Sequence, residues 1–342
     1  MDTIKMAGLK KFESFLIGFD EKSWFEALDN LSPLIHPVDQ DATRIWFAFW
    51  PLHLLRIVQE ADNIEQTELE LELKGQYRLD KCLAFSIRFL FGSRYWSEVK
   101  EAVYDHAVAS TPSDEGLAHH IQIIAKQLAS GLQIPETHVT GITAVALMAL
   151  RQVGLDVFDT SSVATHSPKS SLKQILKTRA TKNQGGLLRF LSTVNAKYSV
   201  VFNEHEKNSF FRAIHGQDVS MAAGMTPGDY QEIDPRCTEG PVPFQCRTGT
   251  CGTCWMGVLS GKENLSPISA WEKDRLKCFG YDFGSYDQEP FPPIRLSCQA
   301  QCLGNIFITV APWNGILNVQ RFAVDGEPEA VANLEDSPSG QS

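Results

Sequence analysis

Four cysteines are spaced in a way that suits metal ligation. Cys246, Cys251 and Cys254 form a C-x4-C-x2-C arrangement, and Cys298 lies far downstream in the segment Arg-Leu-Ser-Cys-Gln. Cysteine binds metals as a thiolate, and soft thiolate ligands select zinc, copper(I) or iron–sulfur centres. These four residues are therefore the first candidates for the chemistry of this chain.

The spacing predicts a 2Fe-2S cluster in preference to a zinc ion. One compact loop that supplies three thiolates, with a distant segment that supplies the fourth, is a ligand arrangement of such clusters. Zinc modules usually combine two short C-x2-C or histidine pairs. Here only one C-x2-C unit is present, and no second one surrounds Cys298.

The residues between the three clustered cysteines are small. Gly249, Thr250, Gly252 and Thr253 allow the backbone to wrap closely around a cluster, and glycine can adopt a positive φ where a turn requires it. Together with Arg247, they are expected to point backbone N–H groups at the sulfur atoms. Such hydrogen bonds help to set the reduction potential of the cluster, which is expected at about −400 mV for this cluster type.

The cluster loop lies in a region with a β pattern. The segments 198–202, 207–214, 255–259 and 305–310 are predicted strands, and 218–224 and 269–278 are predicted short helices. The earlier part of the chain is predicted to be helical, with helices over 41–58, 117–131 and 136–153. Asp41 is the expected N-cap of the first, and Gly154 the expected stop of the last. The alternating Glu–Leu segment 68–74 leaves helix and strand both open.

Residues 196–315 resemble a plant-type 2Fe-2S ferredoxin. The resemblance is carried, in the same order as in that family, by 243–254, 258–267, 295–301 and 304–308. It implies a β-grasp fold, one-electron transfer, and cluster ligation by Cys246, Cys251, Cys254 and Cys298. It also favours Cys298 over Cys302, which falls where the family usually has an apolar residue. A cysteine there is expected to pack as a small hydrophobe.

Two segments, 225–240 and 280–293, are additions to the compact ferredoxin pattern. Either could fold over the cluster or form a partner surface. They leave the ligand set unchanged but bear on subclass and partner choice.

The expected fold class is α+β with two domains. Residues 1–158 are predicted to form an all-α domain, 159–195 a basic linker with a short helix, 196–324 the ferredoxin-like domain, and 325–342 a disordered acidic tail. The linker is either solvated or docks on the acidic C-terminal part. Its basic residues are Lys169, Lys173, Lys177, Arg179 and Lys182.

The charge is concentrated in the C-terminal part. Residues 200–342 contain 18 acidic and 10 basic residues, so this part holds −8 of the chain's net charge of −10. Nucleic acid is therefore not an expected partner, whereas a redox protein with a basic docking face is. The chain has neither a secretory signal at its start nor an apolar run long enough for a transmembrane helix, which predicts a cytoplasmic location.

These observations predict an electron-transfer protein that carries one electron on a 2Fe-2S cluster, with the helical domain as a docking module. A stand-alone enzyme is not expected, because no acid–base or nucleophile constellation is evident and no G-x-G-x-x-G follows a strand. The alternative is a redox-responsive regulatory or scaffold protein that uses the cluster as a sensor. The size of the helical domain motivates that alternative.

Overall fold

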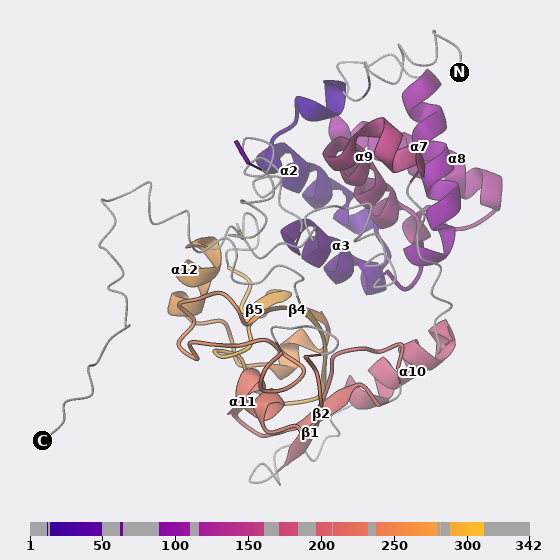
Figure 1. Ribbon diagram of the computed structural model, residues 1–342. Helices are drawn as coiled ribbons and strands as arrows, with labels where there is room; N and C mark the ends of the chain where they lie inside the picture. The colour runs from indigo at the N-terminus through magenta and orange to yellow at the C-terminus, as the bar shows by residue number, and fades with distance from the viewer. Residues whose placement is uncertain are drawn as a thin grey trace, which may run out of the picture.

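The computed structural model describes residues 12, 14–49, 62–63, 89–109, 116–160, 171–183, 196–206, 208–231, 237–278, 281 and 288–310. Within these ranges the chain begins with helices and ends with a mixed sheet (Figure 1). We refer to the helices from α2 to α9 as the helical part, and to the elements from β1 to β7 as the sheet part. This order confirms the predicted helical N-terminal region and the sheet that follows it.

The helical part is built from helices whose apolar sides meet. They are α2 (Glu21–Leu31), α3 (Pro37–Phe49), α7 (Trp96–Ala109), α8 (Leu117–Leu132) and α9 (Thr140–Thr160). Short 3₁₀ turns precede α3, α7 and α9, as η1 (Ser32–Leu34), η3 (Gly92–Tyr95) and η4 (Glu136–His138).

Two predicted helix boundaries differ from the structure in whole or in part. The prediction of Asp41 as an N-cap is wrong: α3 begins at Pro37, because proline suits a first helical position and its fixed φ favours the start of a helix. The stop at Gly154 is confirmed in part. Gly154 leaves helical geometry with φ 72° and ψ 168°, and the chain then resumes a helix to Thr160. The segment 68–74 lies outside the described residues.

A buried carboxylate ties α3 to the chain before α7. Asp39 accepts hydrogen bonds from the backbone N–H groups of Leu90, Phe91 and Gly92 at 2.8 to 3.1 Å. Burial raises the pKa of Asp39, although the three hydrogen bonds act in the opposite direction. The side chain thus satisfies N–H groups that the start of η3 would otherwise leave without a partner.

The five-stranded sheet has the order β2-β1-β7-β4-β5. Its strands are β1 (Lys197–Val201), β2 (Phe210–Ile214), β4 (Trp255–Ser260), β5 (Ile294–Leu296) and β7 (Ile306–Val310). β1 and β7 are parallel, and the other neighbours are antiparallel. The first and last strands of the sheet part, β1 and β7, therefore lie side by side and parallel within a mixed sheet.

Smaller elements complete the sheet part. β3 (Gln217–Asp218) pairs with β6 (Gln301–Cys302), and α11 (Val219–Gly224), η5 (Lys262–Asn264) and α12 (Ala270–Cys278) connect the strands. The predicted strands β1, β2, β4 and β7 and the predicted helices α11 and α12 are confirmed, with boundaries that differ by at most three residues. The short elements β3, β5, β6 and η5 were not predicted.

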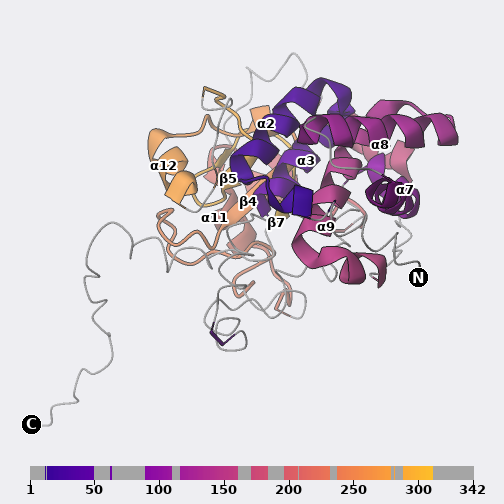
Figure 2. The ribbon, with the colours of Figure 1, turned by 90° about the horizontal axis from the view of Figure 1, so that it is seen from above.

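The strands β4, β5 and β7 are buried on both faces of the sheet. On one face Met256 and Val258 of β4 belong to an apolar core with Val219 and Ala222 of α11. On the other, Trp255 and Leu259 of the same strand join the core of the helical part. Figure 2 shows α3 lying over β4 on this second face. The predicted division into two domains is therefore confirmed only as a division of secondary structure, because one apolar core runs through both parts.

The basic segment contributes the helix α10 (Leu172–Asn183), which lies beside the sheet part (Figure 1). Buried Arg179 donates two hydrogen bonds to the carboxylate of Glu204, at 2.9 and 2.7 Å, and its guanidinium lies 5.9 Å from the ring centre of Phe307. At this residue the segment docks on the sheet part. No helix among the described residues is both long and apolar enough to cross a membrane.

Candidate metal centre

Two of the four predicted ligands meet at the ends of adjacent strands. Cys254 immediately precedes β4, and Cys298 follows β5, which pairs with β4 through Trp255 and Leu296. The Ser297 N–H donates to the Cys254 carbonyl at 2.9 Å. The two sulfur atoms lie 3.3 Å apart, and both side chains are buried. Strand pairing thus brings together two cysteines that are far apart in sequence.

The other two predicted ligands form a second pair in the loop before β4. The Cys251 N–H donates to the Cys246 sulfur at 3.4 Å, and both residues are half-buried. In the part of the chain that the structure describes, no three His, Cys, Asp or Glu side chains converge on one point. Cys246 and Cys251 thus contact each other in the loop, and Cys254 and Cys298 contact each other at the strand ends. Two such pairs fit four-cysteine ligation of a centre with two irons.

The loop reaches this shape through three residues with positive φ. Gly249 and Gly252 have φ of 83° and 72°, as the predicted close wrapping requires. Arg247 has φ 59°, which is uncommon for a residue with a side chain. Its guanidinium bonds to the Glu239 carboxylate at 2.6 Å and stacks 5.1 Å from the ring centre of Phe244. Glu239, at the end of the added segment 225–240, thereby supports the cluster loop.

Hydrogen bonds within the loop favour the thiolate form of Cys246. Burial alone would raise its pKa, but hydrogen bonds from Thr248, Thr250 and Cys251 outweigh burial and lower the pKa to about 5. A cysteine with this pKa is ionised at neutral pH, as a metal ligand must be. Thr250 was among the predicted site residues. Thr248 was missed, and its position two residues after a ligand was the available signal.

Cys298 is likewise surrounded by donors. The hydrogen bond from Cys254 lowers the pKa of Cys298, with further contributions from Gln299 and from the Gly249 backbone N–H. The Gln299 amide nitrogen lies 3.4 Å from the Cys298 sulfur. Gln299 was also missed as a site residue, although it directly follows a ligand. Predicted Thr253 is half-buried in the loop between Cys251 and Cys254.

One helix connects the three-cysteine loop with the segment of the fourth cysteine. On α12, the Trp271 indole N–H donates to the Thr248 carbonyl at 3.1 Å. The next residue, Glu272, accepts hydrogen bonds from Arg295 at 2.9 and 2.8 Å and from the Leu296 N–H at 2.8 Å. Glu272 and Arg295 are both fully buried. The helix therefore sets the distance between the two cysteine-bearing segments.

Cys302 lies apart from the two pairs. It is fully buried in β6, opposite Gln217 of β3, and its S–H donates to the Gly304 carbonyl at 3.1 Å. Burial raises its pKa to about 11. A protonated, hydrogen-bonded thiol in an apolar core agrees with the predicted packing role.

Residues 229–302 match the family model described as the 2Fe-2S iron-sulfur cluster binding domain. This segment is a 2Fe-2S cluster binding domain. The match includes all four predicted ligands. Their thiols form two pairs, and the thiol of Cys246 is already favoured as a thiolate, so they are suitable donors for such a cluster. The helical part lies outside the matched residues, and no solved structure matches the chain.

Serine substitutions separate the two candidates for the fourth ligand. Cys298→Ser is expected to lower the iron content and change the visible spectrum, because a neutral hydroxyl replaces a thiolate. Cys302→Ser keeps a donor toward Gly304 and is expected to retain a wild-type spectrum. Visible absorption and iron analysis of both purified variants make the comparison. A normal spectrum in Cys298→Ser together with its loss in Cys302→Ser would reverse the assignment.

The role of α12 can be tested at its buried ion pair. Glu272→Gln leaves Arg295 charged and incompletely paired, which typically costs about 3–5 kcal/mol of folding stability. We expect a lower melting temperature and reduced iron content, measured by thermal denaturation and metal analysis. Glu263→Gln makes the same chemical change at an exposed position on η5 and serves as the control. Equal iron content in the two variants would show that the pair does not position Cys298.

Proposed function

We propose that Cys246, Cys251, Cys254 and Cys298 hold the 2Fe-2S cluster and that the protein carries single electrons to or from a protein partner. The observation that carries this proposal is the contact of Cys254 with Cys298 at the paired ends of β4 and β5, with the Cys246–Cys251 pair in the loop before β4, all inside the matched segment. A cluster held by these four residues would supply the storage of one electron between a donor and an acceptor.

The two pairs differ in exposure, and this suggests the side on which a partner binds. Cys254 and Cys298 are buried, whereas Cys246 and Cys251 are half-buried next to exposed loop residues. An electron is therefore exchanged most directly through the loop side. The exposed residues there are Gln245, Arg247, Thr248 and Thr250.

In this proposal the helical part provides a docking surface, and the acidic C-terminal part favours a partner with a basic face. Opposite charges accelerate encounter between proteins, and this steering weakens with added salt. The proposal places the protein in the cytoplasm, because the four cysteines must be reduced to act as ligands.

A second candidate function is redox sensing. The shared apolar core favours this function. Cys254 and Cys298 belong to the same buried cluster as residues of the helical part, so a movement of either cysteine would displace packed neighbours that extend into the helical part. In this case the oxidised and reduced forms would present different helical surfaces to a binding partner.

One experiment distinguishes the two functions. The intact protein is titrated anaerobically with dithionite and reoxidised, while visible absorption follows the cluster and hydrogen exchange follows α2 to α9. A carrier is expected to take up one electron per chain reversibly, with the same exchange in both states. A difference in hydrogen exchange of α2 to α9 between the oxidised and the reduced protein supports the sensor. Irreversible bleaching on the first reduction contradicts both.

A further inference from the structure

The helix α3 lies directly on the strand that leads away from Cys254. Ile45 packs on Gly257 of β4, and the ring of Phe49 contacts that of Trp255 edge-on, with centroids 6.2 Å apart. All four residues are buried. The helical part therefore contacts the strand that begins immediately after a predicted cluster ligand.

The two contacts are spaced alike along α3 and along β4, and the second lies nearer to the cysteines. One turn between Ile45 and Phe49 advances about 6 Å along a helix, and the two-residue step from Gly257 back to Trp255 covers about 7 Å of strand. The C-terminal end of α3 thus lies at the cysteine end of β4. Trp255 directly follows Cys254 and pairs with Leu296, two residues before Cys298.

Gly257 allows the close approach of α3. A Cβ at this position would lie 2.6 Å from Ile45 Cγ2 and 3.0 Å from two further Ile45 carbons. Ile45 is fully buried, and its branched side chain has little rotamer freedom. A glycine inside a strand weakens the strand and often marks a close approach by another chain segment. Here that segment is α3.

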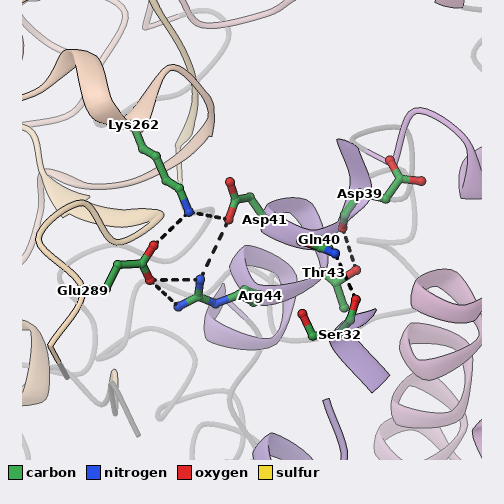
Figure 3. Close-up of polar contacts among 8 residues, drawn as sticks. All are labelled: Ser32, Asp39, Gln40, Asp41, Thr43, Arg44, Lys262 and Glu289. Carbon is green, nitrogen blue, oxygen red and sulfur yellow. Dashed lines mark hydrogen bonds and ion pairs between the residues drawn. The ribbon is translucent and has the colours of Figure 1, made fainter. Parts of the chain in front are cut away.

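Ion pairs fix α3 at the side of this contact (Figure 3). Glu289 accepts from Lys262 at 2.9 Å and from Arg44 at 3.3 Å, and Lys262 also donates to Asp41 at 3.2 Å. The four side chains are 15–28% exposed, so solvent screens them less than surface pairs. Asp41 and Arg44 belong to α3, and Glu289 belongs to the added segment 280–293.

Tyr281, at the start of the same added segment, is buried in the shared core. Burial raises its pKa to about 12, although Arg44 acts in the opposite direction through its charge and a hydrogen bond. Its ring lies 6.4 Å from that of Trp255. Tyr281 therefore contacts both Trp255 and Arg44 of α3, and Glu289 contacts Arg44 as well.

We propose that α3 is a structural component of the cluster site. Ile45 and Phe49 act as positioning residues: through Gly257 and Trp255 they hold the start of β4 and exclude water from the side of Cys254 and Cys298. The helical part then has a role in the cluster's environment that is distinct from partner docking. The inference depends on the four-cysteine assignment and does not depend on the identity of the partner.

The direction of the effect follows from electrostatics. Reduction adds negative charge to a centre held by four thiolates, and a water-poor surrounding disfavours that added charge. The apolar shell around a metal site controls solvent access and therefore the reduction potential. Lifting α3 from β4 should let water approach, shift the midpoint potential to more positive values, and shorten the lifetime of the cluster.

The pair Gly257 and Ile45 allows a test by steric rescue. Gly257→Ala is expected to push α3 from β4, and Ile45→Ala to leave a void there. In Gly257→Ala/Ile45→Ala the added methyl group has the space that Ile45 vacates. We expect both single variants to show a more positive midpoint potential, a several-fold faster loss of iron to a chelator, and faster hydrogen exchange in β4 and α3. The double variant should return toward wild type in all three.

Two controls have the same chemical changes at sites away from α3. Gly131→Ala in α8 meets no atom within 4 Å of the added Cβ, and Ile124→Ala truncates an equally buried isoleucine of α8. Both should keep the wild-type potential. If Gly257→Ala does not fold, Phe49→Leu reduces the contact with Trp255 and is measured in its place.

The outcomes are distinct. A shift in the single variants that reverses in the double variant supports the proposal. A loaded Gly257→Ala or Phe49→Leu protein with wild-type potential, iron loss and exchange overturns it, as does a double variant worse than either single one. Iron content and the visible spectrum of Cys298→Ser and Cys302→Ser test the ligand assignment separately, so that its failure is distinguishable.

Discussion

The burial of β4 on both faces is the constraint on which the rest of the structure depends. Its residues Trp255 to Leu259 are all buried, so each face must be covered by another element. α11 and its neighbours cover one face, and α3 covers the other. Because the same strand begins directly after Cys254, the elements that cover it also determine how rigidly the cluster ligands are held.

The structure gives a physical reason for the later addition, 280–293, and for the basic helix. Glu289 and Tyr281 of the later addition contact α3 or its side chains, and Arg179 of α10 is buried against Glu204 of the sheet part. Buried ion pairs of this kind are weak evidence for stability, but breaking one is costly. They therefore specify how α3 and α10 lie on the sheet part more than they add to its stability.

The sequence predicted the local features well because each has a local cause. The cysteine spacing identified the cluster loop, alternation and turn residues identified β1, β2 and β7, and the glycine at 154 marked a break in α9. Contacts across the chain had no such signal. Nothing near Arg44 in the sequence indicates Glu289, 245 residues away, and the exposed-looking Glu272 of α12 is instead a fully buried partner of Arg295. The misplaced start of α3 had a local cause that was overlooked, namely Pro37.

The central claim is that one chain holds one 2Fe-2S cluster through four cysteines and uses it to carry a single electron. Electron paramagnetic resonance of the anaerobically purified, dithionite-reduced protein, combined with iron and labile-sulfide analysis, tests this most directly. We expect equal amounts of iron and sulfide, two of each per chain, and a rhombic signal that integrates to one unpaired electron per chain. Stoichiometric zinc with neither labile sulfide nor a signal would contradict it.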